Sequence, residues 1–127
     1  MKPNNPHIQL EIFRHIGQAV WAIQECEVTL TQYLRKHQAI PRNSNRRNMK
    51  KYLKKIQELG IFSTQLHKRI EQMLEDQQWL IHGVAGEVSK DFNGGSRVPH
   101  LLQRISALTK EAQNLTKDIT EKLAKHT

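Results

Sequence analysis

The side chains best suited to chemistry are a histidine and a glutamate that the sequence pattern places on two different helices. His82 lies in the stretch Trp79-Leu80-Ile81-His82-Gly83, and a histidine can act as a general acid or base near neutral pH. Glu27 stands on an otherwise apolar helical stripe, where an unpaired carboxylate is costly. We therefore expect Glu27 to meet a partner, His82 or an arginine, or to reach solvent at the bundle edge.

The other polar side chains show no pattern of a metal or cofactor site. None of the seven histidines has a second histidine four residues away, which is the spacing of a helical zinc pair. Gly94-Gly95 lacks the spacing of a phosphate-binding loop and follows no predicted strand. The single cysteine, Cys26, excludes an internal disulfide and is expected to be a packed thiol. We therefore expect no metal and no cofactor.

Almost all of the net positive charge lies in one segment. The 127 residues carry a formal net charge of +8, and residues 35–59 contain nine basic residues against the single acidic Glu58. A concentrated positive field attracts polyanions, although such a tract can also be a solvated helix face. The predicted nucleic-acid-binding residues are Arg35, Lys36, Arg42, Arg46, Arg47, Lys50, Lys51, Lys54 and Lys55.

The spacing of apolar residues predicts four helices and no strand. They cover about residues 6–38, 45–59, 63–88 and 99–125 of a single domain, residues 1–127. The clearest apolar seam is in the last helix, at Leu101, Ile105, Leu108, Ala112, Leu115 and Ile119. Because short connections favour antiparallel neighbours, we expect an all-α, antiparallel up-down four-helix bundle.

Capping and breaking residues mark the predicted helix ends. The second helix can be capped by Ser44 or Asn45 and ends at Gly60, and the third can be capped by Ser63. Pro99 is tolerated in the first turn of the fourth helix. The chain has no apolar run long enough for a signal peptide or a membrane span. We therefore expect a cytoplasmic protein without a membrane partner.

Two helices have apolar residues on more than one side. The runs Val20–Ile23 and Trp79–Ile81 each cover more of the helix circumference than one seam requires. A small bundle cannot bury both helices all round, so we predict a homodimer. The expected interface residues are Trp21, Trp79, Ile81 and His82, with the tryptophans as anchors. The alternative is that both tryptophans cover the ends of the bundle.

The His82-Gly83 ending of the third helix resembles the HEPN superfamily (higher eukaryotes and prokaryotes nucleotide-binding). Members resemble small antiparallel helical bundles that dimerise, and many are ribonucleases. Their motif is an arginine followed four to six residues later by a histidine, on the third helix near the dimer axis. His82 matches the end of that motif, and Glu27 resembles an acidic residue that many members carry on the first helix.

The chain departs from this motif where the arginine belongs. The candidate positions are occupied by Glu75, Asp76 and Gln77, none of which is basic. The resemblance implies that the arginine steadies the reacting phosphate, which a guanidinium does through bidentate hydrogen bonds. Arg69 lies more than three helical turns before His82 and cannot replace it locally. We therefore predict no catalytic residue, with His82 and Glu27 as the only candidates. We expect His82 to have a structural role, hydrogen bonding across the helix interface near the end of the bundle, with Glu27 as a candidate partner.

These observations favour a non-catalytic, HEPN-like dimer that binds nucleic acid through residues 35–55. RNA is the expected ligand. A second hypothesis is a protein-interaction module of a toxin–antitoxin or defence system, in which the basic face binds an acidic protein. A third hypothesis is an atypical ribonuclease that uses His82. Steeply salt-dependent binding to nucleic acid would favour the first hypothesis over the second.

Overall fold

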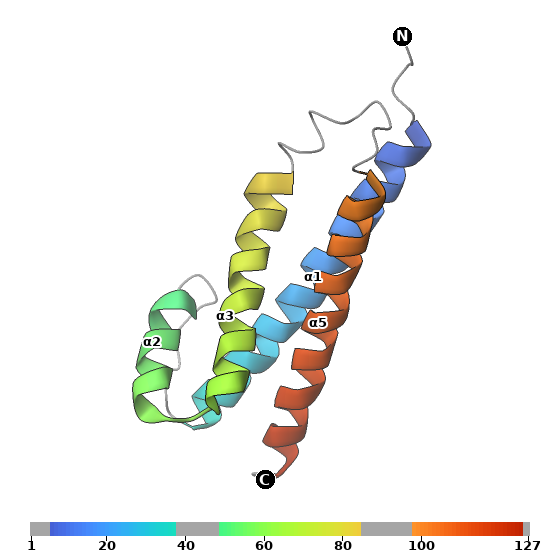
Figure 1. Ribbon diagram of the computed structural model, residues 1–127. Coiled ribbons are helices and arrows are strands. Elements are labelled where there is room, and N and C mark those ends of the chain that lie inside the picture. The colour runs from blue at the N-terminus through green and yellow to red at the C-terminus, as the bar shows by residue number, and fades with distance from the viewer. Residues whose placement is uncertain (1–5, 38–48, 85–97, 126–127) are drawn as a thin grey trace.

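The computed structural model describes residues 6–37, 49–84 and 98–125, and no strand occurs among them. The helices are α1 (Pro6–Lys36), α2 (Met49–Leu59), α3 (Thr64–Gln78) and α5 (Val98–Lys125), and α3 continues into a π-helical turn, η2 (Trp79–Gly83) (Figure 1). For the described residues, the predicted all-α character and the four predicted helices are confirmed. The predicted beginning of the second helix at 45–48 and the end of the third at 85–88 lie outside the described residues.

The three long helices alternate in direction, and the short helix α2 lies against α3 (Figure 1). α1 and α5 run side by side in the same direction, and α3 runs opposite to both. α2 runs in the same direction as α1, so the four helices do not follow the up-down-up-down order that we expected. The expectation assumed short connections between all neighbouring helices, but only the one between α2 and α3 is short.

That short connection is built from the residues that the sequence predicts. Gly60 has a positive φ of 66°, a left-handed conformation that glycine adopts without a steric penalty, and its N–H donates to Gln57 O at 3.2 Å. The Ser63 side chain accepts a hydrogen bond from Leu66 N at 3.1 Å and caps α3. The chain therefore reverses within a few residues, and α2 and α3 become antiparallel neighbours.

The α1–α5 contact holds the fold together. Small side chains occupy its centre: Ala19, Ala22 and Cys26 of α1 and Ala112 of α5 are all buried. Small residues allow two helix axes to approach closely, which explains how α1 and α5 pack over much of their length. The predicted seam of the last helix is confirmed, because all six of its residues are buried.

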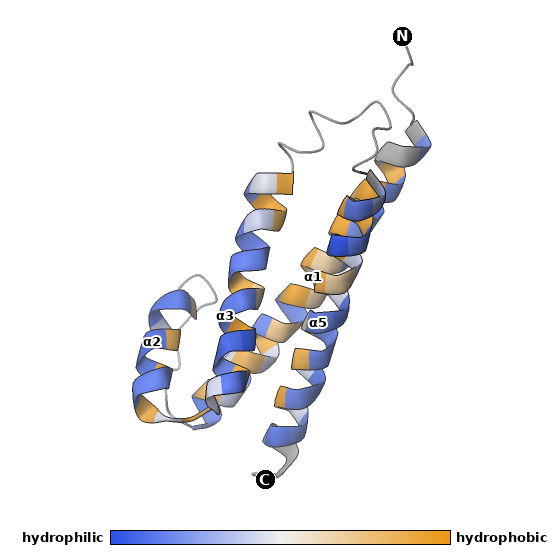
Figure 2. Cartoon of the chain, in the orientation of Figure 1, coloured by the Kyte–Doolittle hydropathy of each residue, from blue (hydrophilic) through white to orange (hydrophobic). Residues whose placement is uncertain are grey.

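α2 is an amphipathic helix that packs through three apolar residues. Met49, Leu53 and Ile56 are buried and belong to the common core. The rest of α2 is largely hydrophilic (Figure 2). One side of α2 therefore packs on the bundle and its lysines lie on the other, exposed side, as the sequence predicts.

Cys26 is a buried, weakly acidic thiol in the α1–α5 contact. Burial raises the pKa of Cys26 from 9.0 to about 11, and the neighbouring Thr116 opposes that shift. A thiol whose pKa is higher in the folded state stabilises the fold below the unfolded pKa and loses that contribution as the pH rises. The relevant window is therefore pH 9 to 11.

We predict that the free energy of unfolding falls between pH 9 and pH 11 by at most about 2–3 kcal/mol because of Cys26. Denaturant unfolding at both ends of that range, on the wild type and on Cys26→Ala, measures this contribution. The variant should start from a lower stability and lose less of it with rising pH. Equal pH slopes for the two proteins would contradict the prediction.

Candidate functional site

Glu27 is buried where α1 passes α3. It is 5% exposed, and its Oε1 accepts a hydrogen bond of 2.8 Å from Nε2 of Gln77. The expectation that Glu27 is buried with a partner is confirmed, but the hydrogen-bonding side chain from α3 is Gln77. Gln77 is also one of the positions where the HEPN motif would have its arginine. A neutral amide therefore meets the carboxylate there.

The Glu27–Gln77 pair lies on the wall of a groove between α1, α2 and α3. The groove has a volume of about 460 Å³. Its polar lining combines Glu27 with Gln24, Gln77, Gln78 and Lys50 of α2. Its apolar wall is formed by Met49, Leu74 and Ile81. The described lining therefore combines amides, a carboxylate and a lysine ammonium, and contains no guanidinium.

The π-helical turn η2 changes which side chains face the core. The N–H of Val84 donates to Trp79 O, five residues back, so the turn holds one residue more than an α-helical turn. Leu80 and Val84 are both buried, whereas Ile81 is 51% exposed and His82 is exposed. His82 is therefore exposed, and the hydrogen bond that reaches Glu27 from α3 comes from Gln77. The three consecutive apolar residues of the sequence do not share one environment.

Trp79 packs within its own chain. The guanidinium carbon of Arg104, on α5, lies 3.6 Å from the centroid of the Trp79 ring, which is a cation–π contact. On the side of its own helix, the ring lies so close to Gly83 that a Cβ there would come within 2.9 Å of Trp79 Cδ1. Gly83 is therefore required for close approach. Of the four predicted interface residues, Trp21, Ile81 and His82 are exposed, whereas Trp79 is half-buried.

Arg69 is committed to an ion-pair network between α3 and α5. Its Nε lies 2.8 Å from Glu111 Oε1 and its Nη1 lies 2.9 Å from Asp118 Oδ2. These carboxylates raise the pKa of Arg69, which stays charged. The guanidinium is thus held on the α5 side of α3, and it does not serve the Glu27–Gln77 groove.

The lysines of α2 form two pairs with different surroundings. Lys50, Lys51, Lys54 and Lys55 are all exposed, as predicted. Lys50 and Lys54 line a second groove, which also contains Glu71 and Glu75 of α3. Lys51 and Lys55 lie about 100° further round the helix and do not line that groove. We call Lys51 and Lys55 the outer lysine pair.

The other predicted nucleic-acid-binding residues divide into two groups. Arg35 and Lys36 are exposed in the last turn of α1, where a positive charge also suits the helix dipole. Arg42, Arg46 and Arg47 lie outside the described residues. The C-terminal ends of α1 and α2 lie at the same end of the bundle (Figure 1).

Comparison with known proteins does not identify the chain. No protein-family model matches it, and no curated protein and no solved structure gives a significant match. Among the described residues, no group of three histidine, cysteine or carboxylate side chains is placed to hold a metal ion. In the part of the chain that the structure describes, none of the helices has the length and apolar character needed to cross a bilayer.

Three features of the site were not predicted from the sequence. The Arg104–Trp79 contact joins residues far apart in the chain, and a helical pattern cannot pair them. The acidic wall facing Lys50 and Lys54 comes from a different helix. The π-helical turn had a partial signal, because three adjacent apolar residues fit an α-helical seam poorly.

We predict that Gln77→Leu lowers the free energy of unfolding by about 1–3 kcal/mol, because the buried Glu27 carboxylate loses a hydrogen bond that crosses two helices. The matched control is Gln78→Leu, the exposed neighbour, with an expected change within about 0.5 kcal/mol. Urea unfolding measures both. Equal effects of the two substitutions would show that the Glu27–Gln77 bond adds no stability.

Proposed function

We propose that the chain is a non-catalytic, HEPN-like helical protein that binds nucleic acid, with RNA as the expected ligand, through the basic residues of the 35–55 segment. The observation that carries the proposal is the amphipathic build of α2. Its apolar side is anchored in the core, and its four lysines are exposed on the opposite side. Lysines fixed on a docked helix keep their relative positions when a phosphate backbone approaches.

The outer lysine pair is the centre of the proposed contact. Lys50 and Lys54 share a groove with Glu71 and Glu75, and these carboxylates offset part of their charge for an incoming phosphate. Lys51 and Lys55 are not in that groove, so more of their positive field reaches the solvent. Arg35 and Lys36 extend the exposed positive charge to the end of α1.

The composition of the Glu27–Gln77 groove supports the proposal that the chain is not a nuclease. Phosphoryl transfer requires a cation or strong hydrogen-bond donors where negative charge develops. In this groove a Gln77 N–H is donated to Glu27, and among the described lining residues the positive charge comes from Lys50 of α2 and not from a guanidinium at position 77. Arg69 is held by Glu111 and Asp118 on another side of α3. His82 alone would supply general acid–base chemistry, worth about 10²–10⁴-fold.

We predict that Lys51→Glu/Lys55→Glu weakens RNA binding more than Lys50→Glu/Lys54→Glu does. Fluorescence anisotropy with a labelled single-stranded RNA, over a range of salt concentrations, measures the affinity and its salt dependence. Losing two phosphate contacts should reduce the slope of log affinity against log salt by about 1.5. The loss should be similar for unrelated RNA sequences, because phosphate contacts position a protein without reading bases.

Lys110→Glu/Lys117→Glu is the matched control, because both lysines are exposed on α5 and the change in net charge is identical. It should weaken binding less than the α2 variants do. Equal losses for all three double variants would mean that only the overall charge matters. Binding of the wild type to an acidic protein but to no nucleic acid would favour the protein-interaction hypothesis.

We predict that the purified protein leaves a mixed RNA pool intact over hours, with and without added divalent metal ions. His82→Ala should change neither the RNA nor the thermal unfolding midpoint appreciably, because the side chain is exposed. Gel analysis of the RNA and a thermal melt of each protein provide the measurements. Cleavage that disappears in His82→Ala would establish the ribonuclease hypothesis instead.

A further inference from the structure

An apolar stripe runs along the outward side of α1. Its large members are exposed: Leu10 66%, Phe13 56%, Trp21 68% and Val28 42%. With Gly17 and Gln24 these residues recur every three or four positions, which places them on one side of a helix. At 1.5 Å per residue, the stripe from Leu10 to Val28 is about 27 Å long.

Among the described residues, the large side chains of this stripe remain exposed and do not join the core. The core side of α1 is the opposite one, where Ile12, Ile23 and Leu30 are fully buried. α1 packs on α5 and α3 through that side. A contiguous apolar surface that the fold does not use is typical of an interaction site.

At the centre of the stripe, the bulky, exposed side chain of Trp21 lies next to the open space at Gly17. The Trp21 Nε1–H donates to Oε1 of Glu25 at 2.8 Å, which holds the ring against the surface of α1. One turn earlier, a Cβ added at Gly17 would meet nothing within 4 Å. Glycine inside a helix lowers its stability relative to alanine, and no contact within the described part of the chain requires one here. A hole for a neighbouring side chain accounts for it.

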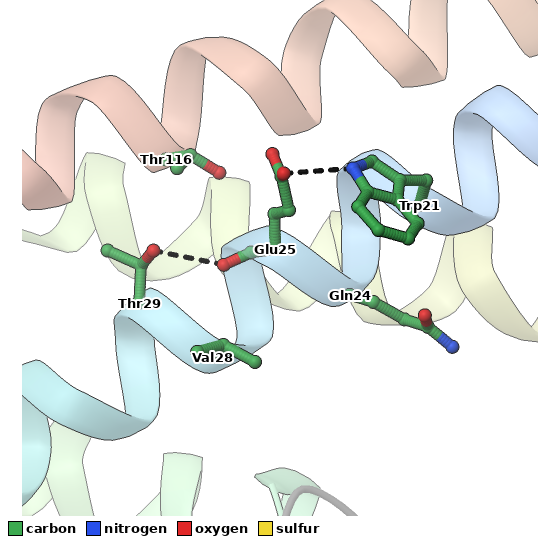
Figure 3. A pocket seen from close by; sticks show the side chains of 6 residues that line it. All are labelled: Trp21, Gln24, Glu25, Val28, Thr29 and Thr116. Atoms are coloured by element: carbon green, nitrogen blue, oxygen red, sulfur yellow. Dashed lines mark hydrogen bonds between the residues drawn. The ribbon is translucent and has the colours of Figure 1, made fainter.

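A hollow lies on the C-terminal half of the same stripe. It has a volume of about 400 Å³ and is lined by Trp21, Gln24, Glu25, Val28 and Thr29 of α1 and Thr116 of α5 (Figure 3). The N-terminal half of the stripe carries the exposed Leu10 and Phe13 instead. One half therefore projects and the other half is hollow, which is the condition for self-complementarity.

We infer that the occupant of this surface is a second copy of the chain, packed with its α1 antiparallel to the first about a two-fold axis at the level of Ala19. Ala19 is the midpoint between Gly17 and Trp21 and also between Leu10 and Val28. The axis therefore brings Trp21 to Gly17 of the partner subunit and Leu10 to the hollow at Val28 of the partner subunit. Such an isologous contact closes as a dimer.

The charges at the edge of the stripe agree with this direction. Arg14 and Glu25 lie on the same edge of α1, nearly equidistant from Ala19. In the antiparallel arrangement each Arg14 comes within one residue of the level of Glu25 of the partner subunit. A parallel arrangement would place the two Arg14 side chains on opposite edges of the contact and would separate Arg14 from Glu25 of the partner subunit by eleven residues along the helices. The opposite charges select the antiparallel dimer.

This interface differs from the one that the sequence suggested. Trp79 is held under Arg104 within the chain, and Ile81 and His82 are exposed on η2, a different element. The α1 dimer uses Trp21 but does not require Trp79, Ile81 or His82. It also stands apart from the proposed nucleic-acid contact, since the lysines of α2 are not part of the stripe.

Sedimentation velocity of the purified chain over a range of micromolar concentrations tests the inference. We expect a reversible dimer, monomer for Trp21→Glu, and a dissociation constant at least about tenfold higher for Gly17→Gln. Gly17→Gln is the sharper variant, because replacing a glycine in an exposed helical position should raise the thermal stability of the fold. A weaker dimer with a more stable fold is not explained by misfolding.

Ile81→Gln is the matched control, because it also removes an exposed apolar side chain but from η2. It should leave the dimer unchanged. A wild-type monomer at all concentrations, or a dimer that is lost in Ile81→Gln and kept in Gly17→Gln, would overturn the inference.

The direction of the two helices has its own test. Arg14→Glu and Glu25→Arg should each weaken the dimer, and the two together should restore it, because the exchanged charges again face each other. Additive weakening in the double variant would exclude the antiparallel arrangement.

Discussion

The arrangement of this protein depends on the close contact between α1 and α5. The small residues Ala19, Ala22 and Cys26 of α1 and Ala112 of α5 are buried, and larger side chains there would push the two longest helices apart. Because the helices are close, α3 covers one side of the pair and meets Glu27 through Gln77. The same contact turns the side of α1 that carries Trp21 away from the core.

The two proposed surfaces therefore lie on different elements and do not compete for the same residues. The lysines of α2 are attached to the bundle through α3, whereas the apolar stripe belongs to α1. In a dimer formed through α1, each subunit would retain its own α2. Two lysine faces on one particle would bind a nucleic acid chain more tightly than either face alone, provided that the ligand spans both.

The sequence predicted the elements and their buried sides but not the contacts between distant residues. Gly60, Ser63 and the seam of the last helix depend on local chemistry, so they could be predicted. The burial of Glu27 was expected, yet its partner depends on how α1 crosses α3. The direction of α2 relative to α1 depends on tertiary packing that helical periodicity does not encode. Trp79 could not be assigned to Arg104 for the same reason.

Gln77 links the buried site to the proposed function. An arginine at this position would place a cation beside Glu27, and its remaining donors could attract a phosphate to the groove. The amide of Gln77 satisfies Glu27 with a hydrogen bond and adds no charge. The groove then has no guanidinium at position 77, while the lysines of α2 are exposed. In the proposed function, the nucleic acid is bound by the outer lysine pair, which does not line this groove.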